Sequence, residues 1–135
     1  MPNKEAIRVV AAGVDADGMA KIASEAGGGR VEAVALGDMQ GARLVKKGQA
    51  HYYLGTCWSG GGGALAAATA LLGAGQVGIA GTPGMAVSRE RVEQLVCEGK
   101  VAFGFPYEQS RSAIPLIIQA IIAHRDGESA VAVHD

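Results

Sequence analysis

A cysteine beside a run of glycines is the feature of this sequence best suited to chemistry. Residues 55–76 read GTCWSGGGGALAAATALLGAGQ, so Cys57 and the only tryptophan, Trp58, precede four consecutive glycines. The positive end of a helix favours a nearby thiol as its thiolate, which makes Cys57 a candidate nucleophile or acid/base group. A second interpretation stays open, in which Cys57 only fills space, because no histidine adjoins it to serve as its base.

The glycines themselves predict a binding loop. A glycine run between a strand and a helix lets backbone N–H groups face outward at the positive end of the helix dipole, where a phosphate or carboxylate fits. The candidate ligand-binding residues are therefore those of this loop, with the next helix expected over residues 64–73: Thr56, Trp58, Ser59, Gly60, Gly61, Gly62 and Gly63.

Another reading of the same stretch is structural. The segment ALAAATALLG is small and apolar on every side, and such a helix must be buried all round, either in the core or against another subunit. The glycines would then permit close packing, and Trp58 would pack into a neighbouring subunit instead of stacking on a ligand. This alternative predicts a homo-oligomer whose interface contains residues 64–73.

Asp15 is the second candidate catalytic residue. Asp15 and Asp17 follow the first apolar run, and either carboxylate could act as a base on a substrate carbon. An aspartate in this place could instead cap the helix that follows.

Alternating apolar runs and helical patterns predict how these residues are positioned. Strands are expected over 6–12, 31–36, 51–55, 76–81 and 101–105, with amphipathic helical patterns between them. Strands that alternate with helices indicate one doubly wound, Rossmann- or flavodoxin-like α/β domain with a five-stranded parallel sheet, and we expect the strand order 2-1-3-4-5.

The predicted order places the candidate residues together. Ligands of such sheets bind outside the carboxyl ends of the strands, where the strand order reverses, here between the first and third strands. Asp15 would lie on one side of this crevice and Cys57 with the glycines on the other. We expect the domain to span residues 1–124, with a C-terminal tail over residues 125–135.

Composition excludes several classes of function. Acidic and basic residues nearly cancel, at 13 against 12, so no nucleic-acid partner is expected. The first residues lack the apolar core of a signal peptide, and the small residues of the uncharged stretch 48–88 insert weakly into a bilayer, so we predict a cytoplasmic protein without membrane insertion.

Metal and cofactor sites are not expected either. Two cysteines in different contexts and three scattered histidines give no zinc-binding spacing. The glycines match part of a dinucleotide fingerprint, but they follow the third strand, and no acidic residue stands about 20 positions on to hold a ribose.

Several longer runs resemble a known family. The segments KKGQAHYYLGTCWSGGGGALAAATALLG, IAGTPGM, EGKVAFGF and SAIPLIIQAI resemble the small bacterial family typified by YhfU, a domain family of unknown function. The likeness covers nearly the whole chain.

A more distant resemblance is to sugar-phosphate isomerases of the ribose-5-phosphate isomerase B type. In those enzymes a first strand ends in Gly-x-Asp-His, and a third strand ends in Cys-Gly-Thr-Gly before an alanine-rich helix. This chain has Gly13-Val14-Asp15-Ala16 and Gly55-Thr56-Cys57, followed by Gly60–Gly63. Asp15 aligns with the aspartate of that family, whereas Ala16 replaces the histidine and Cys57 is displaced from the family's cysteine. The resemblance implies a shared layout with a different or lost reaction.

These observations predict a cytoplasmic, homo-oligomeric α/β protein that binds a small anionic metabolite, with a sugar phosphate as the leading class. Catalysis, where present, would be an isomerisation or related proton transfer by Cys57 and Asp15. The competing hypothesis is a non-catalytic interaction or regulatory protein whose Gly/Ala-rich helix is a subunit interface.

Overall fold

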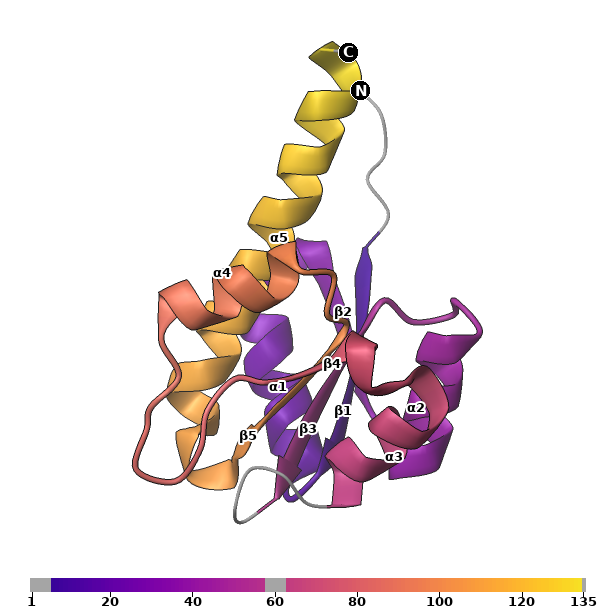
Figure 1. The fold of residues 1–135 in the computed structure, drawn as a ribbon, viewed down its shortest axis with the longest axis vertical. Coiled ribbons are helices and arrows are strands. Elements are labelled where there is room, and N and C mark those ends of the chain that lie inside the picture. The colour runs from indigo at the N-terminus through magenta and orange to yellow at the C-terminus, as the bar shows by residue number, and fades with distance from the viewer. Residues whose placement is uncertain (1–5, 58–62, 135) are drawn as a thin grey trace.

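The chain folds into a five-stranded parallel sheet between two layers of helices (Figure 1). The computed structural model describes residues 6–57 and 63–134. The strands are β1 (Ile7–Gly13), β2 (Val31–Ala35), β3 (Tyr52–Cys57), β4 (Val77–Ile79) and β5 (Ala102–Pro106). The helices are α1 (Ala16–Gly27), α2 (Asp38–Lys46), α3 (Gly63–Leu72), α4 (Arg89–Cys97) and α5 (Ser110–His134), with short 3₁₀ turns η1 (Gly28–Arg30), η2 (Ala74–Gln76) and η3 (Tyr107–Gln109).

The predicted fold class is confirmed, but the predicted order of the last two strands is wrong. The sheet order is β2-β1-β3-β5-β4, so β5 lies inside the sheet and β4 at its edge. All five residues of β5 are buried, as a strand covered on both faces requires. The three-residue strand β4 leaves Ile79 44% exposed and offers its Ile79 carbonyl to the Arg91 guanidinium, which suits an edge.

The helices divide unevenly between the two faces. Helices α1, α4 and α5 pack against one another on one face, and α2 packs against α3 on the other (Figure 1). Right-handed crossovers explain this division. The chain moves in one direction across the sheet from β1 to β2 and in the opposite direction from β2 to β3, so the connecting helices α1 and α2 cover opposite faces.

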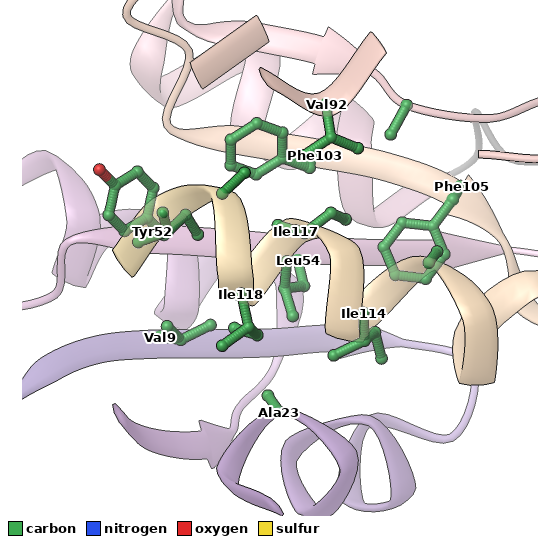
Figure 2. Packing of buried hydrophobic residues seen from close by; sticks show 14 of the residues in the cluster. Val9, Ala23, Tyr52, Leu54, Val92, Phe103, Phe105, Ile114, Ile117 and Ile118 are labelled. Carbon is green, nitrogen blue, oxygen red and sulfur yellow. The ribbon is translucent and has the colours of Figure 1, made fainter. Parts of the chain in front are cut away.

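The larger core cluster lies under α5. In α5, Ile114, Ile117 and Ile118 are fully buried and point toward the strands (Figure 2). Each such side chain stabilises the fold by about 1.5–3 kcal/mol relative to an exposed one. Figure 2 shows Phe103 and Phe105 of β5 packed beside these isoleucines, which explains why β5 occupies an inner position.

Helix α5 continues farther than the sequence pattern suggested. Residues 125–134, expected to lie in a tail, are helical, and the far end of α5 extends past the amino ends of the strands (Figure 1). Two contacts fasten this part: Arg30 donates to both carboxylate oxygens of Asp126, at 2.9 and 3.2 Å, and the Arg125 guanidinium lies 5.3 Å from the centre of the Tyr52 ring. The division into a domain of residues 1–124 and a tail stays a prediction.

No helix in the described part of the chain is both long and apolar enough to cross a bilayer.

Candidate functional site

The carboxyl ends of β1, β3 and β5 lie side by side. In the parallel ladders Gly13 pairs with Thr56, and Cys57 pairs with Pro106. The loops that leave these three strands therefore begin next to one another. The expected adjacency of β1 and β3 is confirmed, and β5 lies beside β3 in the place where β4 had been expected.

The loop after β1 has a constrained backbone. Gly13 has a φ of 104°, and a Cβ there would overlap the Thr56 carbonyl, so only glycine fits. Asp15 follows with a φ of 54°, the one non-glycine residue with positive φ among the described residues. Its carboxylate accepts a hydrogen bond from the Gly18 N–H at 3.3 Å, which confirms the capping role. The left-handed backbone is costly for a side chain and is a feature that functional loops often share.

Thr56 holds the β1 loop against β3. Its side chain is 3% exposed, and its hydroxyl donates to the Val14 carbonyl at 2.8 Å with the Met19 sulfur 3.1 Å away. This hydroxyl is engaged by the neighbouring loop, so Thr56 fixes the position of Asp15 relative to β3. A direct contact between Thr56 and a ligand stays a prediction.

The remaining predicted ligand-binding residues fall mainly outside the described structure. Cys57 is the last residue of β3, and Gly63 is the first residue of α3 and is exposed. The intervening residues are not among those described: Trp58, Ser59, Gly60, Gly61 and Gly62.

A groove lies beside Asp15, between α1 and the beginning of α5. Its volume is about 360 Å³, within the range of small-molecule sites. Three carboxylates, two cations and five uncharged residues line it: Asp15, Gly18, Met19, Lys21, Ile22, Glu25, Tyr107, Glu108, Ser110 and Arg111. The Ser110 hydroxyl donates to the Tyr107 carbonyl at 2.7 Å and so shapes the turn that closes the groove.

The cationic residues of this groove were not predicted from the sequence. Lys21 lies on the exposed face of α1, and Arg111 lies in the first turn of α5, directly after the turn that follows β5. The only signal available in the sequence was position, because Arg111 follows closely after the strand expected over residues 101–105. Both cations can hold an anionic group that enters the groove.

On the opposite face of the sheet, an acidic side chain reaches the start of α3. The carboxylate oxygen Oδ2 of Asp38 is 3.6 Å from the point where a Cβ on Gly63 would stand. Asp38 opens α2, but its carboxylate does not cap that helix, because the N-cap is Gly37 and no side-chain cap bond is present there. The Asp38 carboxylate instead lies near the first residue of the neighbouring helix α3.

Tyr53 ties the first turns of α2 and α3 together. Its hydroxyl donates to the Ala64 carbonyl at 2.6 Å and lies 3.5 Å from the Asp38 carbonyl. The side chain is fully buried, and this burial, with a smaller contribution from the Asp38 charge, raises the pKa of Tyr53 well above its usual range. The position of Asp38 relative to Gly63 is thus fixed by a buried hydrogen bond.

Asp38 changes the electrostatics expected for the start of α3. A helix N-terminus stabilises an anion by about 0.3–1 kcal/mol. Two like unit charges about 4 Å apart near a protein surface repel by about 4 kcal/mol. Solvent reduces this figure for the half-exposed Asp38, so its charge offsets part of the attraction that the helix dipole exerts on an anion at the start of α3.

Helix α3 is buried on one side only. Ala64, Leu65, Ala67 and Ala68 are buried, whereas Ala66, Thr69 and Ala70 are exposed. The expectation of burial on every side is therefore not met within one chain. An open groove of about 310 Å³ runs between α3 and β4: Leu65, Ala66, Thr69, Ala74, Val77 and Ile79 line it.

The described residues contain no group of three or more His, Cys, Asp or Glu side chains that could hold a metal ion.

Strand order and helix placement define the chain as a doubly wound α/β protein with its candidate site at the carboxyl ends of β1, β3 and β5. Residues 7–121 match the family "Protein of unknown function DUF2620". The chain belongs to this family.

Sequence relatives agree with this assignment. The uncharacterized protein YhfU of Escherichia coli strain K12 is 34% identical over 111 residues, which cover 82% of this chain and 95% of the relative. The Shigella flexneri protein of the same description has the same identity and coverage.

Among solved structures, the fold is similar to that of type B ribose 5-phosphate isomerases. A mutant of the Trypanosoma cruzi enzyme has a TM-score of 0.65 at 14% identity and covers 97% of this chain and 100% of its own. The Trypanosoma brucei enzyme has a TM-score of 0.65 at 15% identity, with 87% of this chain and 86% of its own covered. At such identities the likeness establishes the fold alone.

Proposed function

We propose that this chain binds a small anionic, hydroxyl-bearing metabolite, with a sugar phosphate as the leading class. The observation that carries the proposal is the groove of about 360 Å³ beside Asp15, whose lining includes the cations Lys21 and Arg111 among three carboxylates. This groove adjoins the carboxyl ends of β1 and β5, the edge at which open α/β sheets bind ligands. In this proposal the ligand extends from the groove over the loop 55–63. The protein is proposed to act in the cytoplasm.

The structural neighbours support the choice of ligand class. Their names specify ribose 5-phosphate as the substrate of those proteins, and they share this strand arrangement. Ribose 5-phosphate is therefore the first compound to test.

The catalytic form of the proposal is a proton transfer. Aldose–ketose isomerisation moves a proton between adjacent carbons and needs a base and an acid but no cofactor. Asp15 is the candidate base because its loop is held in place by Thr56 and its own backbone is constrained. Cys57, at the end of the adjacent strand β3, is the candidate partner.

Binding is tested by thermal unfolding with ribose 5-phosphate, inorganic phosphate and free ribose. We expect ribose 5-phosphate to raise the melting temperature of the wild-type protein and Arg111→Ala to weaken this effect at least about tenfold in ligand concentration. Arg89→Ala, which removes an exposed arginine at the start of α4, is the matched control. Equal stabilisation of the wild type and Arg111→Ala would contradict the proposed groove.

Catalysis is tested on the same preparations by NMR. Proton exchange into ribose 5-phosphate from deuterated water reports abstraction at carbon even when product does not accumulate. Asp15→Asn keeps a cap and should abolish the exchange, and Cys57→Ser should slow it, whereas Cys97→Ser on the exposed face of α4 should not change it. Full exchange activity in Asp15→Asn would remove Asp15 as the base.

A second candidate function is that of a non-catalytic oligomeric or regulatory protein. The observation that favours it is the open groove between α3 and β4, where Ile79 is 44% exposed. Under this hypothesis a second copy of the chain covers α3. Sedimentation equilibrium of the wild type and of Ile79→Glu tests it, and a monomer in both samples would remove the argument.

A further inference from the structure

The groove between α1 and the beginning of α5 holds its two cations at nearly the same level. Both helices start at the carboxyl edge of the parallel sheet and run back toward its amino edge. They meet where a Cβ on Gly27 would lie 3.3 Å from the Cγ2 methyl of Ile118. Lys21 precedes Gly27 by six residues, and Arg111 precedes Ile118 by seven. With a rise of about 1.5 Å per residue, the backbones at Lys21 and Arg111 differ by only about 2 Å along the helix direction.

Two carboxylates line the same groove closer to the carboxyl edge of the sheet. Asp15 is the N-cap of α1, and Glu108 lies in η3, directly after β5. The third carboxylate, Glu25, lies about one turn of α1 beyond Lys21. From the edge of the sheet inward, the groove therefore presents a negative end followed by a positive level.

The protein itself does not neutralise these charges. Within the ranges 6–57 and 63–134, the side chains of Lys21, Glu108 and Arg111 make no hydrogen bond or ion pair, and Asp15 accepts only the bond from the Gly18 N–H. The three carboxylates and two cations give the lining one excess negative charge. A ligand with only negative charge satisfies the cations but is repelled by the carboxylates, whereas a ligand with charges of both signs pairs with both groups.

We propose that the ligand is an amino sugar phosphate, with its phosphate between Lys21 and Arg111 and its ammonium group between Asp15 and Glu108. This inference rests on the proposed function and narrows its ligand class to a zwitterion. An ammonium group donates three hydrogen bonds and carries a positive charge, whereas a hydroxyl group donates one and is neutral. The carboxylates therefore select an amine over a hydroxyl group at the same carbon of the sugar.

The test is calorimetric titration at about pH 6.5, where carboxylates are ionised and an amine is protonated. The ligands are glucosamine 6-phosphate, glucose 6-phosphate, N-acetylglucosamine 6-phosphate, ribose 5-phosphate and free glucosamine. The first three share one skeleton and differ in carrying an ammonium, a hydroxyl or a neutral amide group. Glu108→Gln removes one carboxylate charge, and Asp15→Asn removes the other and keeps a cap. Glu90→Gln, a matched loss of charge in the first turn of α4, is the control, and circular dichroism establishes that each variant is folded.

We expect the wild type and Glu90→Gln to bind glucosamine 6-phosphate at least about tenfold more tightly than glucose 6-phosphate or the N-acetyl compound. This preference should fall to about threefold or less in Glu108→Gln and in Asp15→Asn. A wild type that binds glucose 6-phosphate or ribose 5-phosphate as tightly as glucosamine 6-phosphate would overturn the inference while the proposed function stands. A preference of unchanged size in Glu108→Gln would overturn it as well. Binding of none of the phosphorylated sugars, or equal binding of free glucosamine and its phosphate, would refute the proposed function and this inference together.

Discussion

The buried hydroxyl of Tyr53 makes a quantitative prediction for Tyr53→Phe. This change removes the 2.6 Å hydrogen bond to the Ala64 carbonyl and leaves the ring in place. Loss of one buried neutral hydrogen bond costs about 1 kcal/mol of unfolding free energy. We expect this cost at about pH 8, where the hydroxyl is protonated in both the folded and the unfolded chain.

Alkaline pH reverses the order of stability. The pKa of Tyr53 is raised in the folded protein, chiefly by burial and secondarily by Asp38, so its stabilising contribution is complete below the unfolded pKa and is lost as the pH rises. With an unfolded pKa of about 10, ionisation of the unfolded chain lowers wild-type stability by about 1.4 kcal/mol at pH 11. Phenylalanine does not ionise, so the two stability curves should cross near about pH 10.6.

The assay is urea unfolding at intervals from about pH 8 to about pH 11, with the wild type and the variant measured in parallel. Other titrating groups act equally in both proteins and cancel in the difference. Val10→Ala, which perturbs the same core cluster without a titratable group, should show a constant difference from the wild type. A constant difference for Tyr53→Phe would refute the reasoning that Tyr53 is buried in its protonated form.

Three further predictions concern the loops and the long helix. Gly13→Ala should destabilise the fold by about 3 kcal/mol or more in urea unfolding, because the residue has a positive φ and its Cβ would overlap the Thr56 carbonyl. The control Gly48→Ala, which also has a positive φ but lies in open space, should cost about 1 kcal/mol. Equal losses in the two variants would contradict the close approach of β1 and β3. Asp126→Asn should raise the amide hydrogen-exchange rate in the last turns of α5. The increase should depend on salt, because the side chains of Arg30 and Asp126 are 33% and 41% exposed and salt screens their ion pair. An unchanged exchange rate would show that this ion pair does not hold the helix. Gly63→Ala should leave the melting temperature unchanged or raise it, because the added methyl group would lie 3.6 Å from Asp38 Oδ2 and alanine favours a helix. A large loss of stability would mean that the first turn of α3 is more crowded than the described residues indicate.

Periodicity was sufficient to predict most elements of the fold. The residues Val92, Leu95 and Val96 recur at helical spacing and are buried in α4, with Ser88 as its cap. Glycine disfavours a helix, but at Gly41 the helix α2 lies so close to β1 that a Cβ would overlap Val10. Local propensity could not reveal this requirement, because it arises from a contact between distant segments.

Strand order depended on information that the local pattern lacks. The runs before β4 and β5 are both short and apolar, and either could lie inside the sheet. The decision rests on Phe103 and Phe105, which have the volume to fill the space beneath α5, whereas β4 has only Val77, Gly78 and Ile79. For the site, residue type identified Asp15, but Lys21 and Arg111 become candidates only because the fold brings α1 and the beginning of α5 together beside Asp15.

The inner position of β5 constrains the order in which the chain can assemble. Because β4 pairs with β5 and not with β3, residues 77–79 have no strand to join until residues 102–106 have been synthesised. During translation β3 therefore keeps an open edge while most of the chain has already left the ribosome. Such long-range closure slows folding and exposes unpaired strands to neighbouring nascent chains. The whole sheet is therefore the cooperative folding unit. A fragment that ends before β5 should not form a stable sheet from the remaining strands.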